Sequence, residues 1–129
     1  MAAPLGHPPQ ARLREAADFT ALRREGKRLA SPCFQAQYRF TDSGLACLGM
    51  AVSRRVSKRA VVRNRIRRII RESFRLSRNG LPVCHVLLIA RTDAAARSRT
   101  ELRTDLDSIW RRLAALKAHD ATRTIAPRS

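Results

Sequence analysis

One segment constrains the fold of this chain more than any other. Residues 58–78, KRAVVRNRIRRIIRESFRLSR, read as a single amphipathic helix. At about 100° per residue, its apolar side chains fall within one arc, namely Val62, Ile66, Ile69 and Ile70. The opposite arc carries Asn64, Arg63, Arg67, Arg68, Arg71 and Arg75. The pattern predicts a helix that buries one side in a core and presents arginines to a polyanion on the other.

The basic character of this region is stronger than helix stability alone would favour. Residues 54–78 contain eleven Lys and Arg residues and one acid, Glu72. A solvated helix face usually mixes charges, whereas like charges four residues apart cost roughly 0.2–0.5 kcal/mol per pair. Four arginines follow one another at that spacing here: Arg63, Arg67, Arg71 and Arg75. Binding to a polyanion therefore explains the pattern better than a purely solvated face.

The whole chain shares this imbalance. It has 27 Lys and Arg against 10 Asp and Glu, which gives a net charge of +17 and a pI near 11.8. Such an excess opposes compact folding unless a polyanion neutralises it, and it predicts binding that weakens steeply with salt. Nucleic acid is the expected partner. An anionic membrane surface is the alternative, but the apolar arc is rich in β-branched residues and lacks Trp, which is more typical of a core.

The cysteines and the apolar segments indicate a soluble, cytoplasmic protein. Cys33, Cys47 and Cys84 are odd in number and widely spaced, with no CxxC pair and no His at ligand spacing. We therefore expect buried, reduced thiols rather than disulfides or a zinc site. The first ten residues lack the apolar region of a secretory signal. The longest apolar run, residues 86–90, is far too short to span a bilayer.

The chain divides into three predicted parts. Residues 1–11 carry three prolines and form a flexible tail, residues 12–117 form one domain, and residues 118–129 form a disordered basic tail. Within the domain we expect a helix over about 15–25 that ends at Gly26. The next two segments, 29–40 and 45–53, predict strands that pair as an antiparallel hairpin across the turn at 41–44.

The second half of the domain follows from periodicity and capping signals. Asn79-Gly80 predicts a left-handed cap at the end of the basic helix. Residues 83–90 are almost wholly apolar and predict an inner strand. Ser98 with Glu101 is a capping-box pattern that opens a last helix with apolar residues at spacings of three and four. The order helix, two or three strands, helix, strand, helix predicts a single-domain α+β sandwich.

The sequence RNRIRR at residues 63–68, followed by RESFR at 71–75, strongly resembles the central helix of the bacterial ribonuclease P protein family. The flanks agree with it over roughly residues 11–117. GMAVSRR at 49–55 resembles the strand before that helix, and residues 84–91 resemble the strand after it. Residues 12–14 with Asp18 and Phe19 resemble the opening helix, and residues 109–113 the closing one.

This resemblance implies a fold and a function. The sandwich would be similar to a domain of a small-subunit ribosomal protein. The basic helix would join two parallel strands by a left-handed crossover, although such connections are nearly always right-handed. The holoenzyme would remove the 5′ leader of precursor tRNA by endonucleolytic hydrolysis. Its RNA subunit would carry the active site and Mg²⁺, and the protein would bind that RNA at 1:1 with no further protein partner.

The resemblance also implies site residues. The residues that would contact the catalytic RNA are Lys58, Arg59, Arg63, Asn64, Arg65, Arg67, Arg68 and Arg71. A cleft between the sheet and the first helix would take the leader, with Phe19, Phe34 and Tyr38 as candidates. Strand alternation leaves open which face of the 29–40 strand lines that cleft. Arg23 stands where the family often has an aromatic residue.

We expect no catalytic residues in the protein itself. His7, His85 and His119 do not pair with an acid at a useful spacing. The sequence has no phosphate-binding glycine loop and no pattern of metal ligands. Only 5% of residues are aromatic, so the aromatic RNA-binding sheet motif is missing too. The alternatives left open are a general structured-RNA-binding or ribosomal protein, and a nuclease that acts without RNA.

Overall fold

The fold is an α+β sandwich, as predicted. The computed structural model describes the backbone of residues 16–41 and 46–125, and the side chains of residues 20–41 and 46–118. In chain order the elements are α1 (Ala16–Glu25), β1 (Lys27–Ala30), β2 (Phe34–Phe40), β3 (Cys47–Ala51), α2 (Ala60–Ser77), η2 (Arg78–Gly80), β4 (Cys84–Ala90), η3 (Thr92–Ala96) and α3 (Arg99–Ile125). The predicted tail at 1–11 lies outside the described residues.

The four strands form one sheet in the order β1-β2-β4-β3. β2 is antiparallel to both β1 and β4, whereas β3 is parallel to β4. The predicted segment 29–40 is therefore two strands, which form a hairpin with Leu29 opposite Ala36. The predicted hairpin between β2 and β3 is wrong. Because β4 is apolar on both faces, it takes an inner position between them, and local turn signals do not reveal that insertion.

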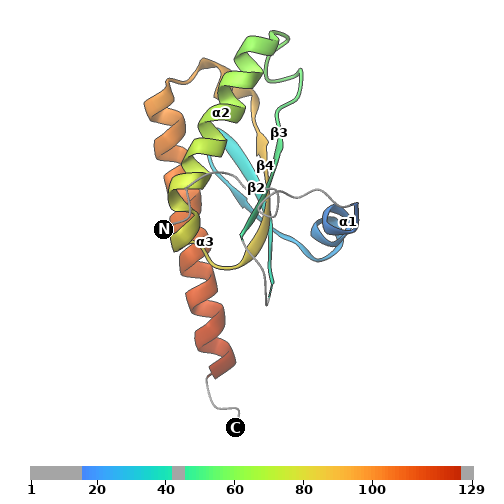
Figure 1. Cartoon of the computed structure of the whole chain (residues 1–129), viewed down its shortest axis with the longest axis vertical. Coiled ribbons are helices and arrows are strands. Elements are labelled where there is room, and N and C mark those ends of the chain that lie inside the picture. The colour runs from blue at the N-terminus through green and yellow to red at the C-terminus, as the bar shows by residue number, and fades with distance from the viewer. Residues whose placement is uncertain (1–15, 42–45, 126–129) are drawn as a thin grey trace, which may run out of the picture.

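The helices cover both faces of this sheet (Figure 1). α2 and α3 lie side by side on one face, and α1 lies alone on the other. α2 connects the parallel strands β3 and β4, which is the crossover expected for the basic helix. The main core lies between the sheet and the two long helices and contains the fully buried Phe34, Phe74, Leu88 and Leu106.

The ends of the helices test the capping patterns that were predicted from the sequence. Ser98 and Glu101 form the predicted capping box: the Glu101 N–H donates to Ser98 Oγ and the Ser98 N–H to Glu101 Oε1, each at 3.1 Å. The predicted left-handed cap at Gly80 is wrong, because α2 ends in a 3₁₀ turn in which the Leu81 N–H donates to Arg78 O at 3.1 Å. α3 continues to Ile125 and so extends past the predicted domain end at 117.

Gly26 ends α1 for a reason of space. Its N–H donates to Leu22 O at 2.9 Å, and a Cβ at this position would collide with the same carbonyl oxygen. The close approach of the two backbone segments therefore requires glycine here, rather than a positive φ. None of the helices in the described ranges is long and apolar enough to cross a membrane.

Candidate nucleic-acid interface

The loop between β3 and α2 positions the first basic side chains. Val52 and Val56 are buried and anchor this loop in the core. The Val56 N–H donates to Ser53 O at 3.1 Å, and the Arg59 N–H donates to Ser57 Oγ at 3.1 Å. The basic side chains of the loop remain exposed around these anchors, namely Arg54, Arg55, Lys58 and Arg59.

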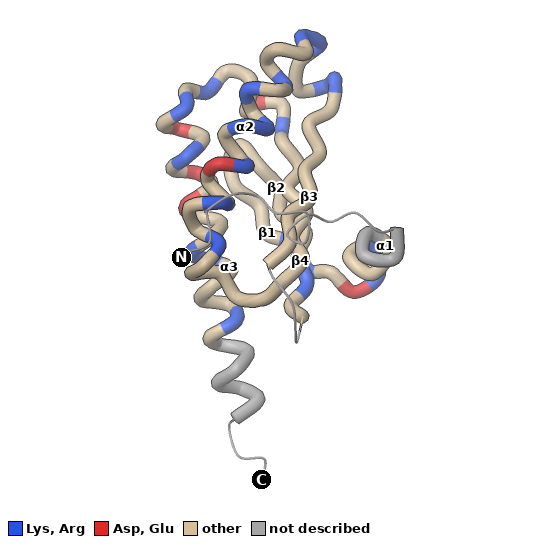
Figure 2. The backbone as a smooth tube through the Cα atoms, viewed as in Figure 1, with Lys and Arg blue, Asp and Glu red and all other residues tan. Residues whose placement is uncertain are grey.

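α2 is amphipathic as predicted. Its buried residues are Ile66, Ile69, Ile70, Ser73 and Phe74. Val62, expected on the same arc, is half-buried at its margin. Asn64, Arg68 and Arg71 are exposed on the opposite arc. Figure 2 shows basic residues along α2 and in the loop that leads into it.

Three arginines on the flanks of α2 are tethered to backbone carbonyls. On one flank, Arg63 Nη1 donates to Ser57 O at 2.9 Å and Arg67 Nη2 to Val52 O at 3.4 Å. On the other flank, Arg65 Nη2 donates to Arg97 O at 3.2 Å. All three side chains are half-buried, so part of the ordering that binding requires has already taken place.

Asn64 belongs to the same network. Its Oδ1 accepts a hydrogen bond from Arg67 Nη1 at 3.2 Å. An amide is the side chain that can do this among arginines, because guanidinium groups offer only donors. This contact gives a physical reason for an amide within a run of basic residues.

The side chains of the remaining four predicted residues are available to bind a ligand. Within the described part of the chain, the side chains of Lys58, Arg59, Arg68 and Arg71 have no hydrogen-bond or ion-pair partner. The structure therefore brings all eight predicted residues onto one continuous surface made of α2 and its entry loop. Free guanidinium groups on such a surface can bind phosphate oxygens in a bidentate manner.

The side of the sheet that faces α1 differs from the prediction. Gln37 Nε2 donates to Leu22 O at 3.1 Å, and Arg39 Nε lies 3.0 Å from Glu25 Oε2. Leu22 packs there with Cys47 and Leu87. The face of β2 toward α1 therefore carries the glutamine and arginine side chains, not the aromatic ones.

Phe34 and Tyr38 point to the opposite face. They are 0% and 4% exposed and belong to the core that α2 and α3 cover. The prediction that they line a cleft beside α1 is wrong, because alternation along β2 sends them away from that helix. Burial also raises the pKa of the Tyr38 hydroxyl. Phe19 lies in α1, but its side chain is outside the described residues.

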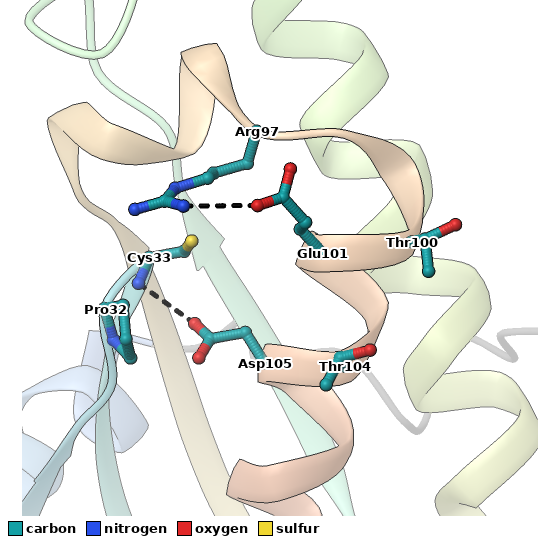
Figure 3. A pocket seen from close by; sticks show the side chains of 7 residues that line it. All are labelled: Pro32, Cys33, Arg97, Thr100, Glu101, Thr104 and Asp105. Atoms are coloured by element: carbon teal, nitrogen blue, oxygen red, sulfur yellow. Dashed lines mark hydrogen bonds and ion pairs between the residues drawn. The ribbon is translucent and has the colours of Figure 1, made fainter.

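A hollow of about 330 Å³ beside the start of α3 was not predicted (Figure 3). Its charged groups already have partners within the fold. Asp105 Oδ2 accepts from Ser31 Oγ at 2.6 Å and from the Cys33 N–H at 3.0 Å. Glu101 pairs with Arg97 at 3.2 Å. Burial raises the pKa of the Cys33 thiol, which therefore stays protonated and is a poor nucleophile. The contacts around this hollow join the segment after β1 to the start of α3.

The described residues offer no intrinsic metal site. No group of three or more His, Cys, Asp or Glu residues among them could hold a metal ion. All three cysteines are buried thiols, as predicted, and desolvation raises the pKa of Cys84 to about 12. His85 lies half-buried on β4, whereas His7 and the side chain of His119 are outside the described residues.

A family model described as Ribonuclease P matches residues 7–114 of this chain. The chain belongs to the ribonuclease P protein family. The ribonuclease P protein component of Cronobacter sakazakii is 34% identical over 108 residues, which cover 84% of this chain and 91% of that protein. The corresponding protein of Legionella pneumophila (strain Corby) is 33% identical over 103 residues, which cover 80% and 89%.

Solved structures agree with this assignment to the ribonuclease P family. The Staphylococcus aureus RNase P protein at 2.0 Å matches with a TM-score of 0.70 and 26% identity, covering 76% of this chain and 90% of that one. The Thermotoga maritima RNase P protein matches with a TM-score of 0.70 and 27% identity, covering 78% and 96%. Relatives of this chain are thus protein components of the tRNA-processing endoribonuclease.

Proposed function

We propose that this chain binds the catalytic RNA of ribonuclease P through α2 and its entry loop. One observation carries the proposal: eight polar and basic residues predicted from the sequence lie on one surface, over an apolar arc that fixes the helix to the core. Four of their side chains are free to meet phosphates, and three more are held in place by carbonyl groups.

The division of labour between protein and RNA is the one that the family resemblance implies. The described residues include no metal cluster, and the carboxylates at the hollow beside α3 are bonded within the fold. On the family resemblance, we expect Mg²⁺ and the hydrolytic step to belong to the RNA subunit. The protein would contribute positive charge. This charge would reduce the repulsion between the phosphates of the catalytic RNA and those of the precursor tRNA, and so help to hold the two RNAs together.

The substrate contact remains a prediction. In this proposal the 5′ leader of precursor tRNA binds near α1, and Phe19 is the candidate that is left after Phe34 and Tyr38 are removed. The polar face of β2 beside α1, with Gln37 and Arg39, replaces the aromatic one expected there. A 1:1 complex with the RNA and a cytoplasmic location are likewise predictions.

Charge reversal tests the RNA-binding surface. The double variant Arg65→Glu with Arg68→Glu should abolish assembly with the catalytic RNA at moderate salt, as measured by filter binding or a mobility shift. The matched control is Lys27→Glu with Arg28→Glu, which changes charge equally on the exposed edge strand β1. Equal loss in both variants, or equal affinity of the native chain for any structured RNA of similar length, would favour a general RNA-binding protein instead.

A further inference from the structure

The basic surface does not end at the edge of α2. The N-terminal end of α3 lies beside this helix (Figure 2). Arg65 reaches across to Arg97 O at 3.2 Å, and Arg99 Nη2 lies 3.4 Å from Glu72 Oε2. Two side-chain contacts therefore join the basic face of α2 to the start of α3. No local sequence pattern predicts this junction, because its partners are 27 and 32 residues apart.

Glu72 stands out at this junction because it is the one acid of residues 54–78. It lines a shallow depression of about 180 Å³ together with Arg68, Arg71 and Arg75. Arg99 pairs with the same carboxylate, so four arginines and one acid gather at this junction. The depression therefore keeps a strong excess of positive charge, and a phosphate group can approach it in spite of the acid.

The ion pair itself contributes little to the fold. The side chains of Arg99 and Glu72 are 62% and 36% exposed, and pairs of this kind are screened by water and salt. A contact that barely stabilises the protein can still fix where an arginine points. Glu72 lines the depression together with Arg68 and Arg71, and its carboxylate holds the Arg99 guanidinium toward α2.

We propose that the RNA-binding surface continues from α2 onto α3 through Arg99, and that Glu72 is a positioning residue for it. The partner is the phosphate backbone of a structured RNA. Arg103 lies one turn further along α3 and is half-buried. Because residues four apart share one face of a helix, Arg103 can extend the strip that begins at Arg99. This inference rests on the proposed function and adds a second helix to its interface.

The first test is the salt dependence of binding between the full chain and the catalytic RNA. Arg99→Ala should reduce the slope of log K against log salt by about one, because one phosphate contact is lost. Arg68→Ala should do the same. The control is Arg28→Ala, which removes an equal charge from the exposed edge strand β1, and its slope should match that of the native chain.

The second test separates positioning from simple charge. If Glu72 only repels phosphate, Glu72→Gln should tighten binding and leave the effect of Arg99→Ala unchanged. If Glu72 positions Arg99, the effect of Arg99→Ala should be smaller in the Glu72→Gln background. Melting temperatures measured alongside should stay unchanged in all these variants, because both side chains are on the surface.

The outcomes distinguish this inference from the proposed function. An Arg99→Ala slope equal to that of Arg28→Ala, with Arg68→Ala behaving as expected, would overturn the extension onto α3 alone. An Arg99→Ala effect that is the same with Glu72 and with Gln would overturn the positioning role. A native chain that shows no preference for the catalytic RNA, with Arg68→Ala also without effect, would overturn the proposed function itself.

Discussion

Arg65 and Ile66 are neighbours in the chain, but one belongs to the basic surface and the other to the hydrophobic core. Arg65 is half-buried on the flank of α2 and donates to Arg97 O, whereas Ile66 is fully buried in the core. This separation implies that substitutions on the two arcs of α2 should affect different measurements: RNA affinity for the basic arc, and unfolding free energy for the apolar one.

Ile66→Ala should lower the free energy of unfolding by about 2–5 kcal/mol, because it removes packed methyl groups and leaves a cavity. Denaturant titration of the native chain and the variant measures this difference. Val61→Ala is the matched control on the same helix, since Val61 is 64% exposed and should change stability by less than about 0.5 kcal/mol. Equal effects at the two positions would mean that α2 does not pack through Ile66.

Ser73 takes part in a buried hydrogen bond between the two long helices. The Trp110 Nε1–H donates to Ser73 Oγ at 2.8 Å, and both side chains are buried. Ser73→Ala should cost about 1–3 kcal/mol, because the indole N–H loses its acceptor away from water. Unfolding free energies of this variant and of Ser77→Ala, at the half-buried last position of α2, should therefore differ clearly. No difference would argue against the hydrogen bond.

At the scale of elements, periodicity predicted most of the helices and strands. The apolar spacing of α2 and α3 and the capping box at Ser98 are local signals, and the structure confirms them. Strand pairing could not be predicted in the same way. The turn at 41–44 indicated a hairpin, but β4 inserts between β2 and β3 from more than 30 residues away in the chain.

In the candidate site too, residues within one local segment could be predicted, and contacts between distant segments could not. The eight residues of α2 and its entry loop could be predicted because they belong to one helix and one short loop. Phe34 and Tyr38 could not be assigned to a face, since alternation alone does not say which side of the sheet the long helices cover. Arg99 was missed because its partner Glu72 belongs to another helix.

The capping box gives α3 a dependence on pH. Hydrogen bonds from Ser98, together with Arg97, hold the pKa of Glu101 below its ordinary value of 4.5. Because the folded state favours the ionised carboxylate, this stabilisation is complete above that value and is lost as the pH falls through the lowered pKa.

Glu101→Gln should therefore make the melting temperature depend less on pH at acid pH. Melting temperatures of the native chain should fall as the pH drops below about 4.5, and they should fall less in the variant. Asp107→Asn, an exposed acid further along α3, is the control and should behave like the native chain. Parallel curves for native chain and Glu101→Gln would contradict the capping role.

At the scale of the whole molecule, charge opposes folding. A net charge of +17 on 129 residues raises the free energy of the compact state by self-repulsion, and a polyanion relieves it. Any anion that binds the folded state and not the unfolded one stabilises it by mass action. The protein and its RNA should therefore stabilise each other.

Sulfate and polyphosphate should raise the melting temperature above that in chloride at equal ionic strength, as measured by calorimetry. The double variant Arg65→Glu with Arg68→Glu should show a smaller rise, because part of the anion-binding surface is gone. A melting temperature that does not respond to the kind of anion would contradict this account of the charge.

The central claim is that the protein supplies binding and the RNA supplies chemistry. Multiple-turnover cleavage of a precursor tRNA at low Mg²⁺, with the catalytic RNA and this protein together and each alone, tests it most directly. The account predicts efficient cleavage at the mature 5′ end only when both are present, and loss of stimulation with Arg65→Glu and Arg68→Glu. Cleavage by the protein alone, or salt-sensitive RNA binding with no stimulation, would contradict it.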